Sequence, residues 1–240
     1  MEYAVVTGAS AGIGEAVARR LLERGLNVIA LQRGEPRLRH PGLIHRSVDL
    51  SDPQATREVA KSIAAEFSVG YLVNNAGANC PALFEDATIE ELRYVTDITL
   101  GAALVLGQAF VPAMRRARFG RIVNISSRAV LGKKGRTVYS SVKAGLIGMT
   151  RTLAIEVGRD GITVNAVVPG PVATEHFNRG HPHGSEQRKR VIQDILVGRI
   201  GEPDDVANAV DFLLAPASGY ITGQSLFVCG GTSLTGTGGE

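Results

Sequence analysis

The chain contains no tryptophan, and aromatic residues make up only 5% of its 240 residues. So few aromatic side chains leave little surface on which nucleic-acid bases could stack. The lysines and arginines are scattered, apart from short runs at 133–134 and 188–190, and form no stripe that could follow a phosphate backbone. We therefore expect no nucleic-acid partner, and the basic pI of about 9.0 supports only weak, salt-sensitive charge binding as a rival interpretation.

Cysteine is scarce as well, because Cys80 and Cys229 stand alone and neither has metal-ligand spacing around it. Among the five histidines, His181 and His183 are the best candidate ligands, but no helical ligand set occurs and we expect no metal. No basic segment followed by an apolar run opens the chain, and no apolar run approaches the 18 residues of a membrane-spanning helix. The sequence predicts a soluble, cytoplasmic protein without a membrane partner.

Apolar sequence is abundant, at 44%, and short β-branched runs alternate with longer amphipathic stretches. This alternation indicates a parallel sheet covered by helices on both faces. With right-handed crossovers, we expect a single α/β domain over 1–240, built on a doubly wound sheet of about seven parallel strands. The predicted strands are 3–7, 27–31, 43–48, 71–74, 121–126, 162–168 and 225–228, and the predicted helices are 12–24, 53–66, 88–116, 139–158 and 203–214.

Two stretches break this rhythm. Residues 175–190 are polar and punctuated by glycine and proline, so 175–195 is a candidate substrate lid. Phe177 and the nearby histidines either line the substrate or simply belong to a loop. The tail is rich in glycine, threonine and serine, and we expect 235–240 to be frayed.

The first predicted strand runs directly into TGASAGIG, residues 7–14, ahead of a predicted helix. Glycines in such a turn let the backbone approach a pyrophosphate, and the helix N-terminus supplies free N–H groups. A lone glycine-rich turn is weak evidence, but this one lies between the first strand and first helix of a βαβ unit, as dinucleotide binding requires. The predicted contacts are Gly8, Ser10, Gly12, Ile13 and Gly14.

The end of the second predicted strand is expected to meet the adenosine ribose of the dinucleotide. An acidic residue there would hold a 2′-hydroxyl, whereas an arginine suits a 2′-phosphate. Gln32 stands where the acid is expected and Arg33 follows it, so the sequence favours NADP(H) over NAD(H). Arg37 either adds charge or lies in solvent. At the end of the third strand, Asp49 is expected to accept from the adenine amino group, with Leu50 beneath the ring.

Tyr139 and Lys143 are four residues apart in a predicted helix and therefore share a helix face. Spacing alone allows an exposed polar pair on a surface helix, or two side chains that meet over one ligand. A phenol exchanges protons poorly at neutral pH until a nearby cation lowers its pKa, which Lys143 could supply.

Five motifs in order decide between these interpretations: TGxxxGIG at 7–14, NNAG at 74–77, IVNISS at 122–127, YxxxK at 139–143 and NAVVPGPVAT at 165–174. Together they resemble the short-chain dehydrogenase/reductase family, of the 3-oxoacyl-ACP-reductase-like type, over nearly the whole chain. The resemblance implies a Rossmann-type fold and an enzyme that interconverts a ketone and a secondary alcohol with NAD(P)(H). NADPH-linked reduction of a small carbonyl substrate is favoured. A homodimer or homotetramer formed through the long helices is also implied.

The resemblance implies a role for each motif residue. Tyr139 is similar to the family's acid/base, and Lys143 to the lysine that binds the nicotinamide ribose and, with the oxidised ring, holds the phenol pKa near working pH. Ser127 is the expected partner of the substrate oxygen, and Ser126, at the commoner spacing, stays open. Asn75, Ala76 and Gly77 pass under the adenosine ribose or shape the sheet, while Pro169, Gly170, Val172 and Thr174 hold the carboxamide.

Two positions depart from the family pattern. Thr99 stands where an asparagine usually steadies a water in the proton relay; its hydroxyl can bind water but is shorter than an amide. Cys229 stands where an aspartate is common, and we interpret it as packing. The Thr99 departure leaves a second hypothesis open, namely a catalytically weak, cofactor-sensing regulator on the same fold.

Overall fold

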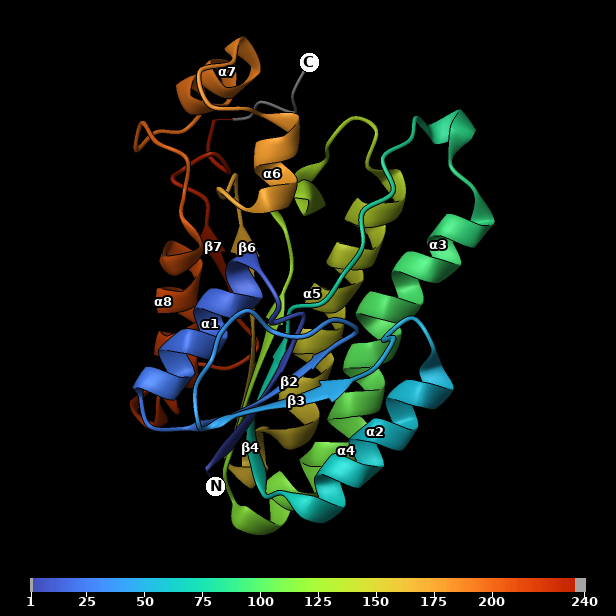
Figure 1. Ribbon diagram of the computed structural model, residues 1–240, viewed down its shortest axis with the longest axis vertical. Helices are drawn as coiled ribbons and strands as arrows, with labels where there is room; N and C mark the ends of the chain where they lie inside the picture. The colour runs from blue at the N-terminus through green and yellow to red at the C-terminus, as the bar shows by residue number, and fades with distance from the viewer. Residues whose placement is uncertain (1, 236–240) are drawn as a thin grey trace.

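The structure is a computed structural model that describes residues 2–235, so residues 236–240 of the predicted frayed tail lie outside the described residues (Figure 1). Seven parallel strands form one sheet in the order β3-β2-β1-β4-β5-β6-β7, which confirms the predicted fold class. The strands lie within two residues of their predicted limits: β1 (Tyr3–Thr7), β2 (Asn27–Gln32), β3 (Leu43–Ser47), β4 (Val69–Asn74), β5 (Gly120–Ile125), β6 (Ile162–Pro169) and β7 (Ser225–Val228).

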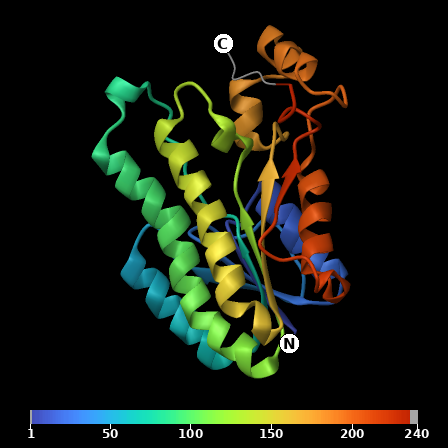
Figure 2. The same cartoon turned by 180° about the vertical axis from the view of Figure 1, so that it is seen from behind.

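Helices cover both faces of the sheet, as the two opposite views show (Figures 1 and 2). α1 and α8 lie together on one face, whereas α2, α4 and α5 cover the other. The bounds are α1 (Gly12–Glu23), α2 (Pro53–Glu66), α3 (Ile89–Thr96), α4 (Ala102–Ala117), α5 (Thr137–Val157), α6 (Glu175–Gly180), α7 (Glu186–Gln193) and α8 (Pro203–Leu214).

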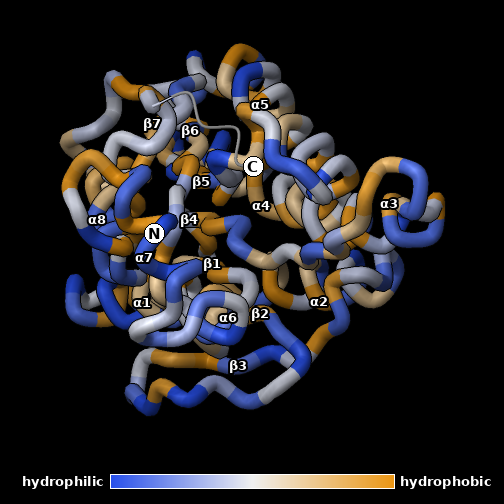
Figure 3. Tube along the Cα trace, turned by 90° about the horizontal axis from the view of Figure 1, so that it is seen from above, coloured by the Kyte–Doolittle hydropathy of each residue, from blue (hydrophilic) through white to orange (hydrophobic). Residues whose placement is uncertain are grey.

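Two hydrophobic cores lie between the sheet and its helix layers. Seen from above, the central strands run between the α1–α8 layer and the layer of α2 and α4 (Figure 3). Every residue of β4, β5 and β6 is buried, because strands covered on both faces have no solvent side. This burial on both faces explains why these strands are continuous apolar runs in the sequence.

The strand order places a functional edge at the carboxyl ends of the strands. The order reverses between β1 and β4, since β2 and β3 extend one way from β1, while β5 to β7 extend the other. Ligands of open α/β sheets bind at such a switch point. The glycine turn follows β1 and Ser127 follows β5 at this edge, and α6 and α7 lie over it at the top of Figure 1.

The predicted helix 88–116 is interrupted in the structure. A π-helical turn, Asp97–Gly101, lies between α3 and α4 and contains Thr99. Such turns insert one extra residue per turn and occur often at functional sites. Apolar periodicity does not reveal them, because the residues on either side remain helical.

The polar stretch after residue 174 forms two short helices, α6 and α7. Thr174 caps α6 by accepting from the N–H of Phe177, and Ser185 caps α7 by accepting from the N–H of Arg188, each at 3.2 Å. Both helices are too short for a clear apolar period, which is why composition alone indicated only a break in the pattern.

The prediction that no apolar run approaches 18 residues was wrong. The helical stretch 89–117 is long and apolar enough, by length and composition, to cross a membrane. Half of its most apolar window is nevertheless buried inside the molecule, as for a core helix packed on a sheet. Among residues 2–235 it is the one helix with this property.

Candidate active site

The turn between β1 and α1 is shaped to take a phosphate group. Gly8 has a φ of +66°, and a Cβ on Gly14 would stand 2.1 Å from the carbonyl oxygen of Gly8, so only glycine fits there. Ala11, which precedes α1, makes no side-chain cap, so the first N–H groups of the helix keep their hydrogen-bonding capacity. Ser10 and Ile13 are half-buried on the same turn. These features fit the pyrophosphate of a dinucleotide.

The NNAG segment after β4 braces this turn. The N–H groups of Asn75 and Ala76 both donate to Oγ1 of Thr7 at 2.9 Å. The Asn75 amide also donates to the carbonyl oxygens of Thr7 and Gly8, at 2.9 and 3.1 Å. Of the two interpretations of this motif, these bonds favour the one in which it shapes the backbone.

The end of β2 carries arginine rather than acid at the exposed position. Gln32 is buried and donates to the carbonyl of Gly34, so it presents no carboxylate. Arg33 is exposed, with Nη1 3.7 Å from Oδ2 of Asp49. Hydrogen bonds from Ser51 lower the pKa of Asp49, and Arg33 lowers it further. Leu50 is buried, so this edge has the polar and apolar parts that an adenosine needs.

The base of the candidate lid lies directly against the glycine turn. A Cβ on Gly12 would stand 3.0 Å from Cγ2 of Thr174. One residue further on, Glu175 forms an ion pair with Arg37, and this arginine lowers the Glu175 pKa. A hollow of about 500 Å³ is lined by Glu175, Asn178 and Arg179. The ion pair therefore joins the loop after β2 to the first turn of α6.

α5 presents Tyr139 and Lys143 on one face, as their spacing predicts. Lys143 is buried, with Nζ 5.8 Å from the centre of the Tyr139 ring and 2.7 Å from the carbonyl oxygen of Ile125, to which it donates. Burial lowers the pKa of Lys143 to about 8. The lysine is thus held behind the tyrosine at the end of β5.

The two candidate serines do different things. Ser126 is buried and donates its hydroxyl to the carbonyl oxygen of Lys143 at 2.8 Å, which fastens α5 to the end of β5. Ser127 lies close enough to the Tyr139 phenol to lower the tyrosine pKa, and its hydroxyl accepts from the N–H of Ala129 at 3.2 Å. The geometry therefore favours Ser127 as the residue that faces a substrate oxygen beside Tyr139.

The pKa of Tyr139 is raised above its ordinary value, because burial of the ring outweighs the opposing effects of Ser127 and the charge of Arg136. The sequence-based expectation of a phenol pKa near working pH depends on Lys143 together with a charged nicotinamide ring, and it stays a prediction. Arg136 was missed by sequence reasoning, since no motif points to it.

Thr99 and Lys143 both lie against Gly77. Its Oγ1 and Nζ of Lys143 are both 3.3 Å from the point where a Cβ on Gly77 would stand. Thr99 is 3% exposed, and its hydroxyl has no hydrogen-bond partner among residues 2–235. A buried hydroxyl without a partner is costly, and so marks a place where a water or ligand atom would be bound.

A buried amide chain holds α5 on the sheet and was also missed. Asn74 donates to Asn124 at 2.8 Å, Asn124 donates to Thr150 at 2.8 Å, and Thr150 donates to the Leu146 carbonyl at 2.7 Å. Asparagines inside the otherwise apolar strands β4 and β5 were the available signal, because buried polar groups need partners.

The segment after β6 closes the edge. The N–H of Gly170 donates to the carbonyl of Val228 at 2.9 Å, and a Cβ on Gly170 would stand 2.7 Å from Cys229. Cys229 is buried, as a packing role requires. Pro169 ends β6, and Val172 is buried and bridges to Gly201.

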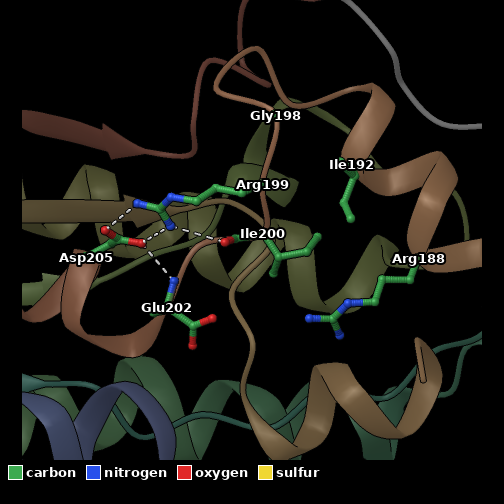
Figure 4. Close-up of a pocket in the computed structure, with 7 residues that line it drawn as sticks. All are labelled: Arg188, Ile192, Gly198, Arg199, Ile200, Glu202 and Asp205. Atoms are coloured by element: carbon green, nitrogen blue, oxygen red, sulfur yellow. Dashed lines mark hydrogen bonds and ion pairs between the residues drawn. The ribbon is translucent and has the colours of Figure 1, made fainter. Parts of the chain in front are cut away.

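The candidate lid is built around a buried arginine. Arg188 donates to Oδ1 of Asn178 and to the carbonyl of His181, at 2.8 and 3.1 Å, and lies 5.6 Å from the ring centre of Phe177. The His181 ring stacks on the Phe177 ring. Among residues 2–235, no group of three histidine, cysteine or acidic side chains could hold a metal ion. Figure 4 shows the adjoining pocket, about 410 Å³, with Arg188 on one side and the Arg199–Asp205 ion pair on the other.

Comparison with known proteins shows the family of the chain. The family model described as enoyl-(acyl carrier protein) reductase matches residues 8–233. The chain belongs to the short-chain dehydrogenase/reductase family and is an oxidoreductase acting on CH–OH and C=O groups.

Among its relatives, the 3-oxoacyl-[acyl-carrier-protein] reductase FabG of Rickettsia felis is 38% identical over 231 residues, which is 95% of each chain. The (2S)-[(R)-hydroxy(phenyl)methyl]succinyl-CoA dehydrogenase subunit BbsD of Thauera aromatica is 37% identical and covers 96% of each chain. A crystal structure from Beutenbergia cavernae, provisionally named an NAD(P)-dependent gluconate 5-dehydrogenase and holding NADP at low occupancy, has a TM-score of 0.88, 34% identity and 96% coverage of each chain.

Proposed function

We propose that this chain reduces a ketone to a secondary alcohol with NADPH, using Ser127, Tyr139 and Lys143. The observation that carries the proposal is the arrangement at the end of β5: Lys143 Nζ lies 5.8 Å from the centre of the Tyr139 ring and donates to the Ile125 carbonyl, and Ser127, two residues further on, lowers the Tyr139 pKa. The FabG relatives support reduction of a 3-oxoacyl group as the starting point for assays.

Each residue has one task in this mechanism. The Ser127 hydroxyl donates to the carbonyl oxygen and holds it in place, while Tyr139 gives that oxygen a proton as negative charge develops on it. Lys143 binds the nicotinamide ribose and supplies positive charge behind the phenol. The bound nicotinamide supplies the hydride. Thr99, with its free hydroxyl beside Lys143, binds a water that returns a proton toward the tyrosine.

NADP(H) is favoured over NAD(H) because Gln32 and then Arg33, rather than an acid, stand at the end of β2. Arg33 is exposed there and Arg37 lies on the following loop, both suited to a 2′-phosphate. The adenosine rests against Asp49 and Leu50, and the pyrophosphate on Gly8, Ser10, Gly12, Ile13 and Gly14. Asn75, Ala76 and Gly77 hold the turn and the ribose, and Pro169, Gly170, Val172 and Thr174 hold the carboxamide.

The segment 175–195 serves as the lid over a single domain, and the chain forms a homo-oligomer through its long helices. Leu104 on α4 and Ile155 on α5 are large apolar side chains that remain 51% and 84% exposed. Phe110 on α4 and Leu146 on α5, by contrast, are buried inside the subunit. A cytoplasmic location stays a prediction.

The test is a spectrophotometric assay of NADPH and NADH oxidation with 3-oxoacyl thioesters, cyclic diketones, aryl ketones and keto sugars, run beside Tyr139→Phe. Turnover of one class with NADPH, lost in the variant, is the expected result. A 2-enoyl thioester reduced in place of every ketone would contradict the proposed reaction. Tight NADPH binding without turnover of any substrate would favour the cofactor-sensing regulator.

A further inference from the structure

The loop between the two hydroxyl residues of the site is unusually basic. It begins directly after Ser127 with a 3-10 turn, Arg128–Leu131, and ends at Arg136, just before α5. Gly132 and Gly135, with φ of +100° and +67°, reverse the chain between them. As a result the N–H of Arg136 donates to the carbonyl of Lys133 at 3.2 Å, and the basic residues are gathered on a short span.

Arg136 is the member of this loop that lies nearest the chemistry. Its backbone is fixed by a bridge to Ala82, whose N–H donates to the Gly135 carbonyl at 3.2 Å. One guanidinium nitrogen, Nη1, exposes less than 1 Å² and has no hydrogen-bond partner in the described part of the chain. The charge of Arg136 lowers the pKa of the Tyr139 phenol, so the guanidinium acts on the position where the substrate oxygen is held.

Two further cations belong to the same loop and lie near Arg136. Lys133 is exposed, and its pKa is lowered by partial desolvation and by the charges of Arg136 and Arg128, which places it near both arginines. Arg128 makes only a long bond, 3.5 Å, to the carbonyl of Thr232. Within residues 2–235, no carboxylate forms an ion pair with any of the three. Three uncompensated like charges beside a helix N-terminus repel one another, and a bound anion relieves that repulsion.

The cofactor's phosphates do not account for this cluster. The glycine turn follows β1, and Arg33 and Arg37 follow β2. The basic loop follows β5, which β4 separates from β1 in the sheet. An anion held by this loop therefore belongs to the substrate.

We propose that Arg128, Lys133 and Arg136 bind a carboxylate or phosphate group on the substrate, close to the carbonyl that Ser127 and Tyr139 hold. The inference rests on the proposed function and narrows it, because the preferred substrate is then an anionic ketone rather than a neutral one. Guanidinium groups bind both oxyanions through charge-assisted, planar hydrogen bonds.

The experiment compares each anionic ketone with a neutral ketone of the same carbon skeleton around the carbonyl. Acetoacetate and 2-oxobutyrate are assayed beside their methyl esters, and hydroxyacetone phosphate beside hydroxyacetone. For the preferred oxyanion we expect kcat/KM to exceed that of the neutral partner by about 10- to 100-fold, the usual worth of hydrogen bonds to a charged group. The carboxylate and phosphate arms identify which oxyanion the site takes.

Three variants assign the effect to the cluster. Arg136→Gln and Lys133→Gln are expected to remove most of the anion-to-neutral ratio, chiefly through a higher KM for the anion. Lys134→Gln removes the same charge from the next residue, which is exposed as Lys133 is, and is expected to leave the ratio unchanged because the site uses Lys133 and not its neighbour. A ratio near one in the unaltered protein, or a ratio that both cluster variants preserve, would overturn the inference.

The anion site can be tested separately from the proposed function. Reduction of neutral ketones without anion preference overturns only the anion site. If no ketone is reduced, calorimetric titration of the NADPH-bound protein with acetoacetate and with hydroxyacetone phosphate decides the matter. The site is supported if either anion binds and if its binding is weakened by Lys133→Gln but not by Lys134→Gln. The inference is overturned if neither anion binds.

Discussion

The ammonium of Lys143 donates a 2.7 Å hydrogen bond to the carbonyl oxygen of Ile125, the last residue of β5. In return, the Lys143 carbonyl accepts from the hydroxyl of Ser126 at 2.8 Å. These two bonds join one turn of α5 to the end of one strand. Because Ser127 follows that strand end and Tyr139 lies one turn earlier on α5, the same contacts set the distance between serine and tyrosine.

Burial of Lys143 predicts a pH dependence of stability. Its pKa falls from 10.5 in the unfolded chain to about 8 in the folded one, so below pH 8 both states are protonated and the folded state bears the cost of a buried charge. Between pH 8 and 10.5 the unfolded chain holds more protons, so this group makes the free energy of unfolding rise with pH. Relative to Lys143→Met, we expect a rise of at most about 3 kcal/mol.

Urea unfolding of both proteins at several pH values between 7 and 10.5 measures this difference. Groups other than Lys143 titrate alike in the two proteins and cancel. A difference that stays flat or falls across this interval would show that the lysine is not buried as a charged group.

The two serines predict opposite phenotypes. Ser126→Ala removes a buried hydrogen bond, and we expect it to lower the free energy of unfolding by about 1–3 kcal/mol. Ser127→Ala removes only the part-buried bond from the Ala129 N–H and is expected to cost less stability, but to lower kcat by about 10- to 1000-fold, since a donor to the developing oxyanion is lost. Urea unfolding and kcat are measured on both variants. The reverse pattern would assign the substrate contact to Ser126.

The glycine turn and the Tyr139–Lys143 pair could be located from the sequence because local rules determine them. The shape of the turn depends on a glycine at position 14, and the pairing of Tyr139 with Lys143 depends on their spacing along one helix. Neither feature needs many long-range contacts. Arg136 could not be found this way, since its importance depends on the fold of the loop that brings it near Tyr139. The π-helical turn at Thr99 was hidden for a similar reason, as its flanking residues satisfy an ordinary helical pattern.

Thr99 predicts a separation of stability from turnover. Thr99→Val replaces a buried hydroxyl without a partner by a methyl group of similar shape, so stability is expected to hold or to rise by up to about 1–3 kcal/mol. If the hydroxyl holds the relay water, kcat falls while the dissociation constant for NADPH is unchanged. Equal kcat in both proteins would remove Thr99 from the relay. Thr99→Asn, which restores the residue usual in the family, is the companion variant.

The arginines after β2 predict cofactor choice. Arg33→Gln is expected to weaken NADPH binding by about 10- to 100-fold and leave NADH binding unchanged, because only NADPH carries the 2′-phosphate. Arg39→Gln, an exposed change on the same loop, is the matched control. Glu175→Gln frees Arg37 from its ion pair, and we expect NADPH to bind a few-fold more tightly. Fluorescence titration of each nucleotide measures these constants, and equal losses for both nucleotides would contradict a 2′-phosphate contact.

Arg188 predicts how the lid is held together. Its guanidinium joins α6 to α7 through Asn178 and the His181 carbonyl, and it is 9% exposed without an acidic partner. Arg188→Met keeps much of the apolar contact with Phe177 but removes both bonds. We therefore expect faster hydrogen exchange confined to 175–195, together with a raised KM, while the melting temperature changes little.

Lys189→Met is the matched control, since Lys189 is exposed and pairs only with Glu186 one turn earlier. It is expected to leave both the exchange rates and KM as they are. If Arg188→Met speeds exchange across the sheet as well, the arginine supports the whole fold. If exchange in 175–195 rises but KM does not, the two helices do not act as a lid, because opening them then leaves substrate binding unaffected.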